Sequence, residues 1–287
     1  MDTEKNTDTF VAFDDVTFTY PPVEDDLDEN GNQIVPKPVF EHFSANLPTG
    51  FVSFVGQNGC GKSTLMLLAS GRLQPDSGEV TLLGKKLCTM DDEEKNLLAS
   101  MIYQNMEFET EDKVEELLTQ VLENGKFAGK AKGIRSDKSL IEEVTEVFEL
   151  EESLGKILTH LSKGEIQRVL LAFSILYGSD SIFMDEPMFA MEDRQKEKSL
   201  EYLRDYVHKT GKTIYISMHE IDLSKKYADQ VLLFYPNRDM ALGTPAEVLT
   251  DEDLEKAYEI PAALLKKKED LTRNQLIEEA KLLGGKS

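Results

Sequence analysis

The sequence predicts an α/β fold with a mostly parallel sheet, on the basis of strand patterning, strand spacing and two motifs at strand ends. Short apolar runs that are typical of buried strands occur at residues 51–55, 182–184, 212–217 and 230–235. A helix-patterned stretch separates residues 184 and 212, as the crossover between parallel strands requires. A glycine-rich turn follows the first run and two carboxylates follow the second, so we expect functional groups at these strand ends.

The first fifty residues have a different pattern, because apolar and polar side chains alternate along them. Residues 11–20 are typical of a half-buried strand, and residues 40–47 form a second β block. The segment between them, residues 22–38, is acidic and is interrupted by Gly and Pro. This composition favours a hairpin tip or a solvated loop.

The middle and the end of the chain have helical patterns. Apolar residues recur at spacings of three and four over residues 114–122 and 140–150, which predicts two amphipathic helices. From residue 261 the chain is charged and helix-like. Whether this tail, residues 262–287, packs on its own core, dimerises or regulates is left open by the pattern.

Composition restricts the class of partner. A net charge of -22 and a pI near 4.6 oppose direct binding to nucleic acid or to anionic lipid. Only two cysteines are present, Cys60 and Cys88, which excludes a disulfide framework and agrees with a reducing compartment. Residues 1–10 lack the pattern of a signal peptide, and no apolar run reaches the roughly 20 residues that cross a bilayer. We therefore expect a cytoplasmic protein whose membrane role, if any, is through a partner.

The strongest motif is a G-x-x-x-x-G-K-[ST] loop between a strand and a helical run. Its glycines let the backbone curl tightly, so that successive N–H groups face one anion at the positive end of the following helix. We expect Lys62 to reach the β- and γ-phosphates of a nucleotide and Ser63 to bind Mg²⁺. The predicted nucleotide-binding residues of the loop are Gly56, Gln57, Asn58, Gly59, Cys60, Gly61, Lys62, Ser63 and Thr64.

Two adjacent carboxylates, Asp185 and Glu186, end the apolar run at residues 182–184. Triphosphate hydrolysis needs one carboxylate that holds Mg²⁺ through its water shell and another that orients or deprotonates the attacking water. We assign the metal role to Asp185 and the catalytic role to Glu186. Two turn-capping carboxylates before a proline are the alternative.

ATP is favoured over GTP, because no Asn-Lys dipeptide is present to begin a guanine-reading N-K-x-D motif. Tyr20 ends the first predicted strand and is expected to stack on the adenine, which selects only weakly since every base offers a ring face. Packing of Tyr20 on the core is the alternative. Cys60 is interpreted as a small filler of the loop, or alternatively as a thiol that makes ATP binding sensitive to oxidation.

A third motif makes a family resemblance specific. Residues 161–165 (LSKGE) precede a strongly apolar helix, Gln104 follows an apolar strand, and His219 follows the run at residues 212–217. With the phosphate loop and the carboxylate pair, in this order over about residues 10–250, the chain resembles the ATP-binding cassette (ABC) ATPases. The resemblance implies a P-loop NTPase fold in a cassette domain at residues 1–261. That domain would contain an N-terminal antiparallel β subdomain and an inserted α-helical subdomain at about residues 105–178.

The resemblance also implies that two cassettes face each other head to tail around two ATP. Ser162 and the N–H of Gly164 would then touch the γ-phosphate held by the other subunit, at a helix N-terminus that favours an anion. Gln104 would sense the metal and the attacking water, and His219 would contact the γ-phosphate opposite Glu186. The implied catalytic residues are Glu186, His219 and Gln104, and the implied metal ligands are Ser63, Gln104 and Asp185.

Three positions depart from the family pattern. Lys163 and Glu165 replace a glycine and the glutamine of the LSGGQ signature. We expect a carboxylate near the phosphates to weaken their attraction to the signature and to reduce activation of the other subunit. Glu192 replaces the aspartate that links the two cassettes, so communication between the two sites is expected to change.

Two functions of different class remain open. In the first, the chain is the ATP-hydrolysing subunit of a transporter, attached to the inner face of the cell membrane through a separate permease. Residues 241–250 (ALGTPAEVLT) are similar to the ending of importer subunits for metal chelates, metal ions and vitamin B12, which favours import. In the second, it is a soluble cassette ATPase that acts as an assembly or regulatory switch. The motifs leave open the transported substrate and the choice between a homodimer and a paired homologue.

Overall fold

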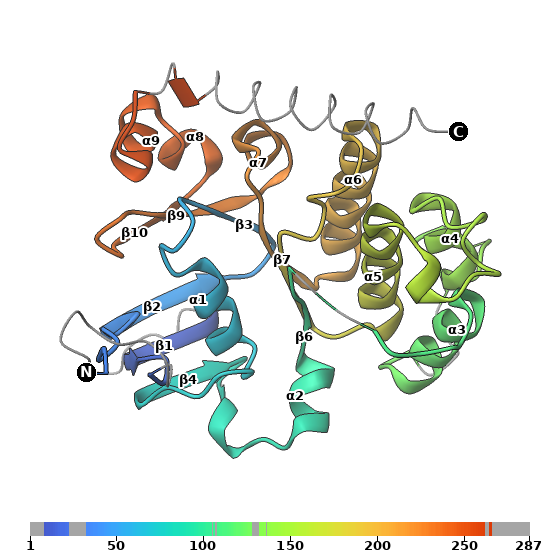
Figure 1. The fold of residues 1–287 in the computed structure, drawn as a ribbon, viewed down its shortest axis with the longest axis horizontal. Coiled ribbons are helices and arrows are strands. Elements are labelled where there is room, and N and C mark those ends of the chain that lie inside the picture. Colours follow the sequence, from blue (N-terminus) through green and yellow to red (C-terminus); the bar gives the residue numbers. More distant parts are fainter. Residues whose placement is uncertain are drawn as a thin grey trace.

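The computed structural model of the 287-residue chain describes residues 9–22, 33–104, 106, 108–127, 132–135, 137–261 and 264–265. Most of the acidic segment 22–38 and nearly all of the predicted tail helix lie outside these residues. The predicted α/β class is confirmed: the described residues contain one antiparallel sheet, one mostly parallel sheet and a group of helices beside them (Figure 1).

The central sheet has six strands in the order β10-β9-β3-β8-β7-β6. The pairs from β9 to β6 are parallel, and β10 joins the edge antiparallel to β9. Every residue of β3, β7 and β8 is buried, which explains why these strands are continuous apolar runs and not alternating ones. The strand bounds are β3 Phe51–Val55, β6 Ala99–Ile102, β7 Ser181–Asp185, β8 Thr213–Ser217, β9 Gln230–Phe234 and β10 Met240–Gly243.

The second sheet is antiparallel, in the order β2-β1-β4-β5, and is made by the N-terminal part of the chain. Its strands are β1 Thr9–Phe18, β2 Phe40–Pro48, β4 Ser77–Leu82 and β5 Lys85–Lys86. A shared apolar cluster joins this sheet to the central one and includes side chains of helix α1, Lys62–Ala69. The predicted N-terminal antiparallel subdomain is therefore confirmed, although β4 and β5 are not among the strands that patterning predicts.

Three helices of one lobe lie between β6 and β7 in sequence: α3 Val114–Asn124, α4 Leu140–Val147 and α5 Lys163–Tyr177. We call α3, α4 and α5 the helical lobe; Figure 1 places it, in green and yellow, beyond β6 and β7. Their apolar faces share one cluster with the central sheet, as the spacing of three and four predicts. The predicted helix at residues 140–150 is too long, because α4 ends at Val147 and Glu149 takes a left-handed φ of 53°.

The remaining helices cover the central sheet or its edge. Helix α6 contacts β3 and β8, and α7 contacts β3. Helices α8 and α9 lie with β9 and β10 at the end opposite the helical lobe (Figure 1). Their bounds are α2 Asp92–Leu98, α6 Asp193–Thr210, α7 Ile221–Tyr227, α8 Pro245–Val248 and α9 Asp251–Tyr258, with short 3₁₀ turns at Leu87–Thr89 and Leu158–His160. Within the described residues, no helix combines the length and the apolar character that spanning a bilayer requires.

Candidate functional site

The glycine-rich loop connects β3 to α1, in the strand–loop–helix setting that the motif predicts. Gly56, Gly59 and Gly61 have φ values of 154°, 80° and 106°, which side chains with a Cβ rarely adopt. A Cβ on Gly56 would also lie 2.9 Å from Cβ of Phe234. Gly61 is the N-cap of α1 and offers no side chain to the first N–H groups of that helix. These N–H groups are therefore available to an anion.

Lys62 is buried and its ammonium points back into the loop. Nζ donates hydrogen bonds of 2.8 Å to the carbonyl oxygens of Gly56 and Gln57 and lies 3.9 Å from Sγ of Cys60. Within the described residues it has no carboxylate partner, so its charge is available to a phosphate. Cys60 is only 6% exposed, and burial raises the pKa of its thiol. This supports the interpretation of Cys60 as a filler, since the reactive form is the thiolate.

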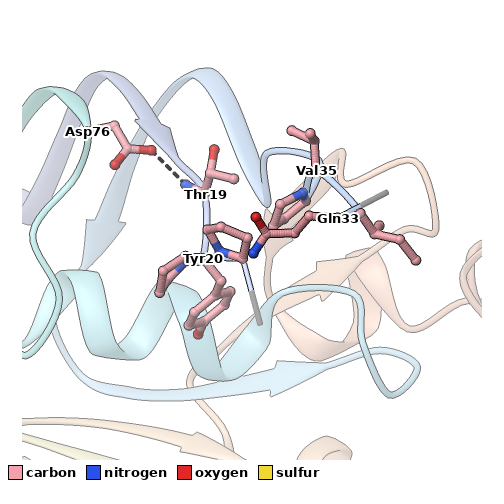
Figure 2. A pocket seen from close by; sticks show the side chains of 9 residues that line it. Thr19, Tyr20, Gln33, Val35 and Asp76 are labelled. Carbon is pink, nitrogen blue, oxygen red and sulfur yellow. Dashed lines mark hydrogen bonds between the residues drawn. The ribbon is translucent and has the colours of Figure 1, made fainter. Parts of the chain in front are cut away.

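Tyr20 lies beside the same helix, two residues after β1 ends. Its hydroxyl is 3.1 Å from Oγ1 of Thr64, and its ring packs edge-on against Phe18 with centroids 4.9 Å apart. The side chain is still 40% exposed and borders a pocket of about 320 Å³ (Figure 2). The N–H of Thr19 donates to Oδ2 of Asp76 at 2.8 Å and fixes the strand end. Packing of Tyr20 on the core is thus present, and its stacking on a base stays a prediction.

The carboxylate pair stands at the end of β7, next to β8. Oγ of Ser217, in β8, donates a hydrogen bond of 2.7 Å to Oδ1 of Asp185, and Oγ of Ser217 accepts the N–H of Glu186 at 2.8 Å. Glu186 has a φ of 49°, a conformation that non-glycine residues adopt only when their surroundings impose it. Sequence patterning misses Ser217; its signal is a hydroxyl side chain at the last position of a strand that is buried throughout.

Glu186 is joined to both other predicted catalytic side chains. Nε2 of Gln104 donates to Oε2 of Glu186 at 2.7 Å, and Nε2 of His219 lies 2.8 Å from Oε1. The hydrogen bond from His219 holds the pKa of Glu186 below its ordinary value despite partial burial, and the charge of Lys62 acts in the same direction. Glu186 is therefore ionised at neutral pH, as a group that accepts a proton must be.

The residues proposed for Mg²⁺ fit a hard cation. Asp185 is only 7% exposed and forms no ion pair within the described residues, so its buried charge has no counter-ion there. Ser63 lies exposed in the first turn of α1, which contacts β7. A hydroxyl and a carboxylate that leave most positions to water and phosphate are the ligands Mg²⁺ takes in nucleotide sites.

The signature residues form the start of α5. Ser162 is the N-cap, with its Oγ accepting the N–H of Glu165 at 3.3 Å, while the N–H of Ser162 donates to Oε2 of Glu165 at 2.8 Å. Gly164 faces the carbonyl of Ala190, since a Cβ there would lie 2.7 Å from that oxygen. The expected effect of Glu165 on the other subunit stays a prediction, and the structure adds the partners of its carboxylate. Its carboxylate is engaged by Ser162 and by Lys156, whose Nζ is 2.9 Å from Oε1, so it is paired and not a free negative charge.

The predicted residues thus form two groups. The first group surrounds the start of α1 and the end of β7. It consists of the phosphate loop, Tyr20, Asp185, Glu186, Gln104 and His219. Ser162 and Gly164 belong to the helical lobe, and Figure 1 shows α5 and α1 on opposite sides of β6 and β7. Glu192, at the N-cap of α6, makes no capping hydrogen bond with its side chain. Its role between two cassettes stays a prediction.

Comparison with known proteins agrees with this geometry. The family described as ABC transporter matches residues 41–189. The petrobactin import ATP-binding protein YclP of Bacillus subtilis is 29% identical over 226 residues, which cover 78% of this chain and 88% of that protein. A cobalamin import ATP-binding protein, BtuD of Halobacterium salinarum, is 26% identical over 214 residues, which cover 74% of this chain and 53% of that protein.

A solved structure has the same fold. It is a dimeric ATP-binding cassette in a post-hydrolysis state, bound to ADP and Pi, with 21% sequence identity and a TM-score of 0.67. The match covers 82% of this chain and 98% of the solved one. Together, the matched family, the phosphate loop and the carboxylate pair at the end of β7 establish that this chain is an ATPase of the ABC transporter family.

Proposed function

We propose that this chain is the ATP-hydrolysing subunit of an ABC importer, which closes on a second cassette around two ATP and drives a separate membrane permease. The observation that supports it most is the position of Glu186, held between Gln104 and His219 beside the phosphate loop. In this arrangement Glu186 would be the base, Gln104 would sense the state of the site, and His219 would orient the carboxylate of Glu186.

The chemistry follows from the contacts at Glu186. Its ionised carboxylate is placed to orient and deprotonate the water that attacks the γ-phosphate. His219 orients the carboxylate through Oε1 and is placed to contact the γ-phosphate, while Gln104 bonds Oε2. Lys62 and the N–H groups at the start of α1 would hold the phosphates. Ser63, Gln104 and Asp185 would hold Mg²⁺, which would supply positive charge to the β- and γ-phosphates when bound.

The second cassette follows from the separation of the two groups of residues. Ser162 and Gly164 present a helix N-terminus, which favours an anion, yet they lie on a different lobe from the phosphate loop. A head-to-tail pair of chains would bring each signature onto the ATP of the other. The catalytic chemistry is the same whether the partner is a second copy of this chain or a homologue.

Coupling to a permease is supported by the relatives and by Gln104. Gln104 contacts Glu186 and is followed by the segment that enters α3, so a change at the nucleotide is communicated to the helical lobe. YclP and BtuD are import proteins, which supports import here. We place the chain at the inner face of the cell membrane, attached through the permease and without contact to nucleic acid.

Isolation of the chain from detergent-solubilised membranes of its own cells tests this function. We expect a polytopic membrane protein to co-purify in stoichiometric amount, and the ATPase rate of the complex to respond to the transported substrate. Recovery of the chain only from the soluble fraction, with full ATPase activity and no membrane protein, would support the alternative of a soluble regulatory switch.

A further inference from the structure

Glu165 has an unusually complete set of partners for a residue in the first turn of a helix. Its Oε2 accepts the N–H of Ser162 at 2.8 Å, and its Oε1 accepts Nζ of Lys156 at 2.9 Å and Oγ of Ser153 at 3.3 Å. The side chain is 20% exposed, so these contacts are partly shielded from water. The carboxylate therefore bridges the N-cap of α5 and the turn that precedes it.

The turn that carries Lys156 is attached to the start of α3. The carbonyl of Lys156 accepts the N–H of Val114 at 3.0 Å, and the carbonyl of Leu154 accepts the N–H of Glu115 at 3.1 Å. These bonds satisfy N–H groups that the first turn of α3 cannot satisfy internally. The start of α3 and the N-cap of α5 are thus connected through the Lys156–Glu165 ion pair.

The same carboxylate holds Ser162 in place. Its Oγ accepts the N–H of Glu165, and its own N–H is engaged by the carboxylate. The hydroxyl of Ser162 also interacts with the carboxylate of Glu165 and is one of the groups that lower the pKa of Glu165, so Glu165 engages both the backbone and the side chain of the serine. With backbone and side chain both engaged, the hydroxyl oxygen of Ser162 has a restricted set of positions.

We propose that Glu165 is a positioning residue for the shared ATP site: anchored on Lys156, its carboxylate fixes Ser162 so that the serine hydroxyl is presented to the γ-phosphate held by the other cassette. The inference rests on the proposed function, because Ser162 acts on ATP only when two cassettes close. Glu165 stands where the family signature has a glutamine. In this inference its negative charge pairs with Lys156 and does not face the phosphate.

The test uses the full chain carrying Glu186→Gln, in which ATP is bound but not hydrolysed. The quantity measured is the MgATP concentration at which half of the protein is dimeric, determined by size-exclusion chromatography with light scattering. We expect Glu165→Ala to raise it about tenfold and Glu165→Gln or Lys156→Met to raise it about threefold, as loss or weakening of a charged hydrogen bond implies. The double variant Lys156→Met/Glu165→Gln should add little to either single change, since both remove one ion pair.

Two further measurements separate positioning from general stability. MgATP affinity of the monomer, measured at protein concentrations too low for pairing, should not change, because Ser162 does not touch the ATP of its own chain. Glu142 provides the matched control: it forms the same capping box with Ser139 at the start of α4. Glu142→Ala should destabilise the fold to a similar degree and leave the dimerisation midpoint within twofold.

Each outcome has a distinct meaning. If the Glu186→Gln parent does not dimerise with MgATP, the proposed function itself is wrong. If the parent dimerises and Glu165→Ala has the same midpoint, or Glu142→Ala shifts it equally, only the positioning role is overturned. Should Glu165→Ala fail to fold, Glu165→Gln and Lys156→Met carry the same test.

Discussion

Nε2 of Gln104 donates a 2.7 Å hydrogen bond to Oε2 of Glu186, although 82 positions separate the two residues in sequence. The contact is possible because Gln104 follows β6 and Glu186 follows β7, which are adjacent parallel strands. Parallel strands deliver the residues after their carboxyl ends to one edge of the sheet. The proposed base for hydrolysis, Glu186, is thereby connected directly to the segment that leads into the helical lobe.

Replacing Gln104 should slow hydrolysis more than it weakens ATP binding. Gln104→Ala removes one of the two side chains that contact the carboxylate of Glu186, and loss of one such hydrogen bond is expected to lower kcat about tenfold. The KM for ATP should stay within about twofold, because Lys62 and the loop are unchanged. Steady-state ATPase kinetics check this, with Gln120→Ala, on the exposed side of α3, as the control. Equal losses in kcat and in ATP affinity would contradict the assignment.

Ser217 should prove important for both stability and activity. Ser217→Ala leaves the buried carboxylate of Asp185 and the N–H of Glu186 without their shared partner, which is expected to cost about 1–3 kcal/mol of unfolding free energy. Urea denaturation measures this cost, and the ATPase rate should fall with it. Ser174→Ala is the comparison, since Ser174 is buried and, among the described residues, its hydroxyl bonds the carbonyl of Leu171 within its own helix. A rate loss as large in Ser174→Ala would show that stability alone is responsible.

Gly164 should not tolerate a side chain. A Cβ at Gly164 would lie 2.7 Å from the carbonyl oxygen of Ala190, so the start of α5 must shift away from the segment that follows Glu186. We expect Gly164→Ala to destabilise the chain by about 1–3 kcal/mol and to reduce ATP-dependent dimerisation. Gly155→Ala, where a Cβ meets nothing within 4 Å, is the control and should behave as the parent in thermal unfolding and chromatography. Wild-type behaviour of Gly164→Ala would disprove the close approach.

The Glu165 ion pair predicts a specific pH dependence. The hydrogen bond from Lys156 lowers the pKa of Glu165 from its ordinary 4.5 to about 2. A lowered folded-state pKa means that the carboxylate stabilises the fold fully above about pH 4.5, and that this contribution is lost as the pH falls toward 2. The difference in unfolding free energy between the parent and Glu165→Gln, measured in urea, should therefore be constant near neutrality and shrink below about pH 4.5. A difference that grows on acidification would contradict the ion pair.

Much of the fold follows from the sequence, because its strands are continuous apolar runs or alternating ones. β3, β7 and β8 are buried on both faces, and their composition records this directly. β10 is not predicted from the apolar pattern, because it is a short edge strand with no fully buried residue. β4 and β5 escape it because their pairing with β1 and with each other depends on a tertiary arrangement and not on local preference.

The motifs indicate which residues are candidates for the site, but they do not indicate which of these residues contact one another. Their spacing places Gln104, Glu186 and His219 after strands, yet nothing in the sequence indicates that both other side chains bond the same carboxylate. The contacts of Glu165 are even harder to predict from the sequence, because its partner Lys156 belongs to a turn without a motif. A substitution within a motif suggests a change in the binding of phosphate, whereas the structure places the new charge in an ion pair.

The measurement that tests the central claim most directly is the oligomeric state of Glu186→Gln with and without MgATP, by size-exclusion chromatography with light scattering. If Glu186 is the base that we propose, the variant keeps the nucleotide site but does not deprotonate the attacking water, so we predict a monomer without nucleotide and a stable dimer with MgATP. Adding Lys62→Ala to the same variant should abolish the dimer. A Glu186→Gln protein that binds MgATP and remains monomeric at every concentration would contradict the account.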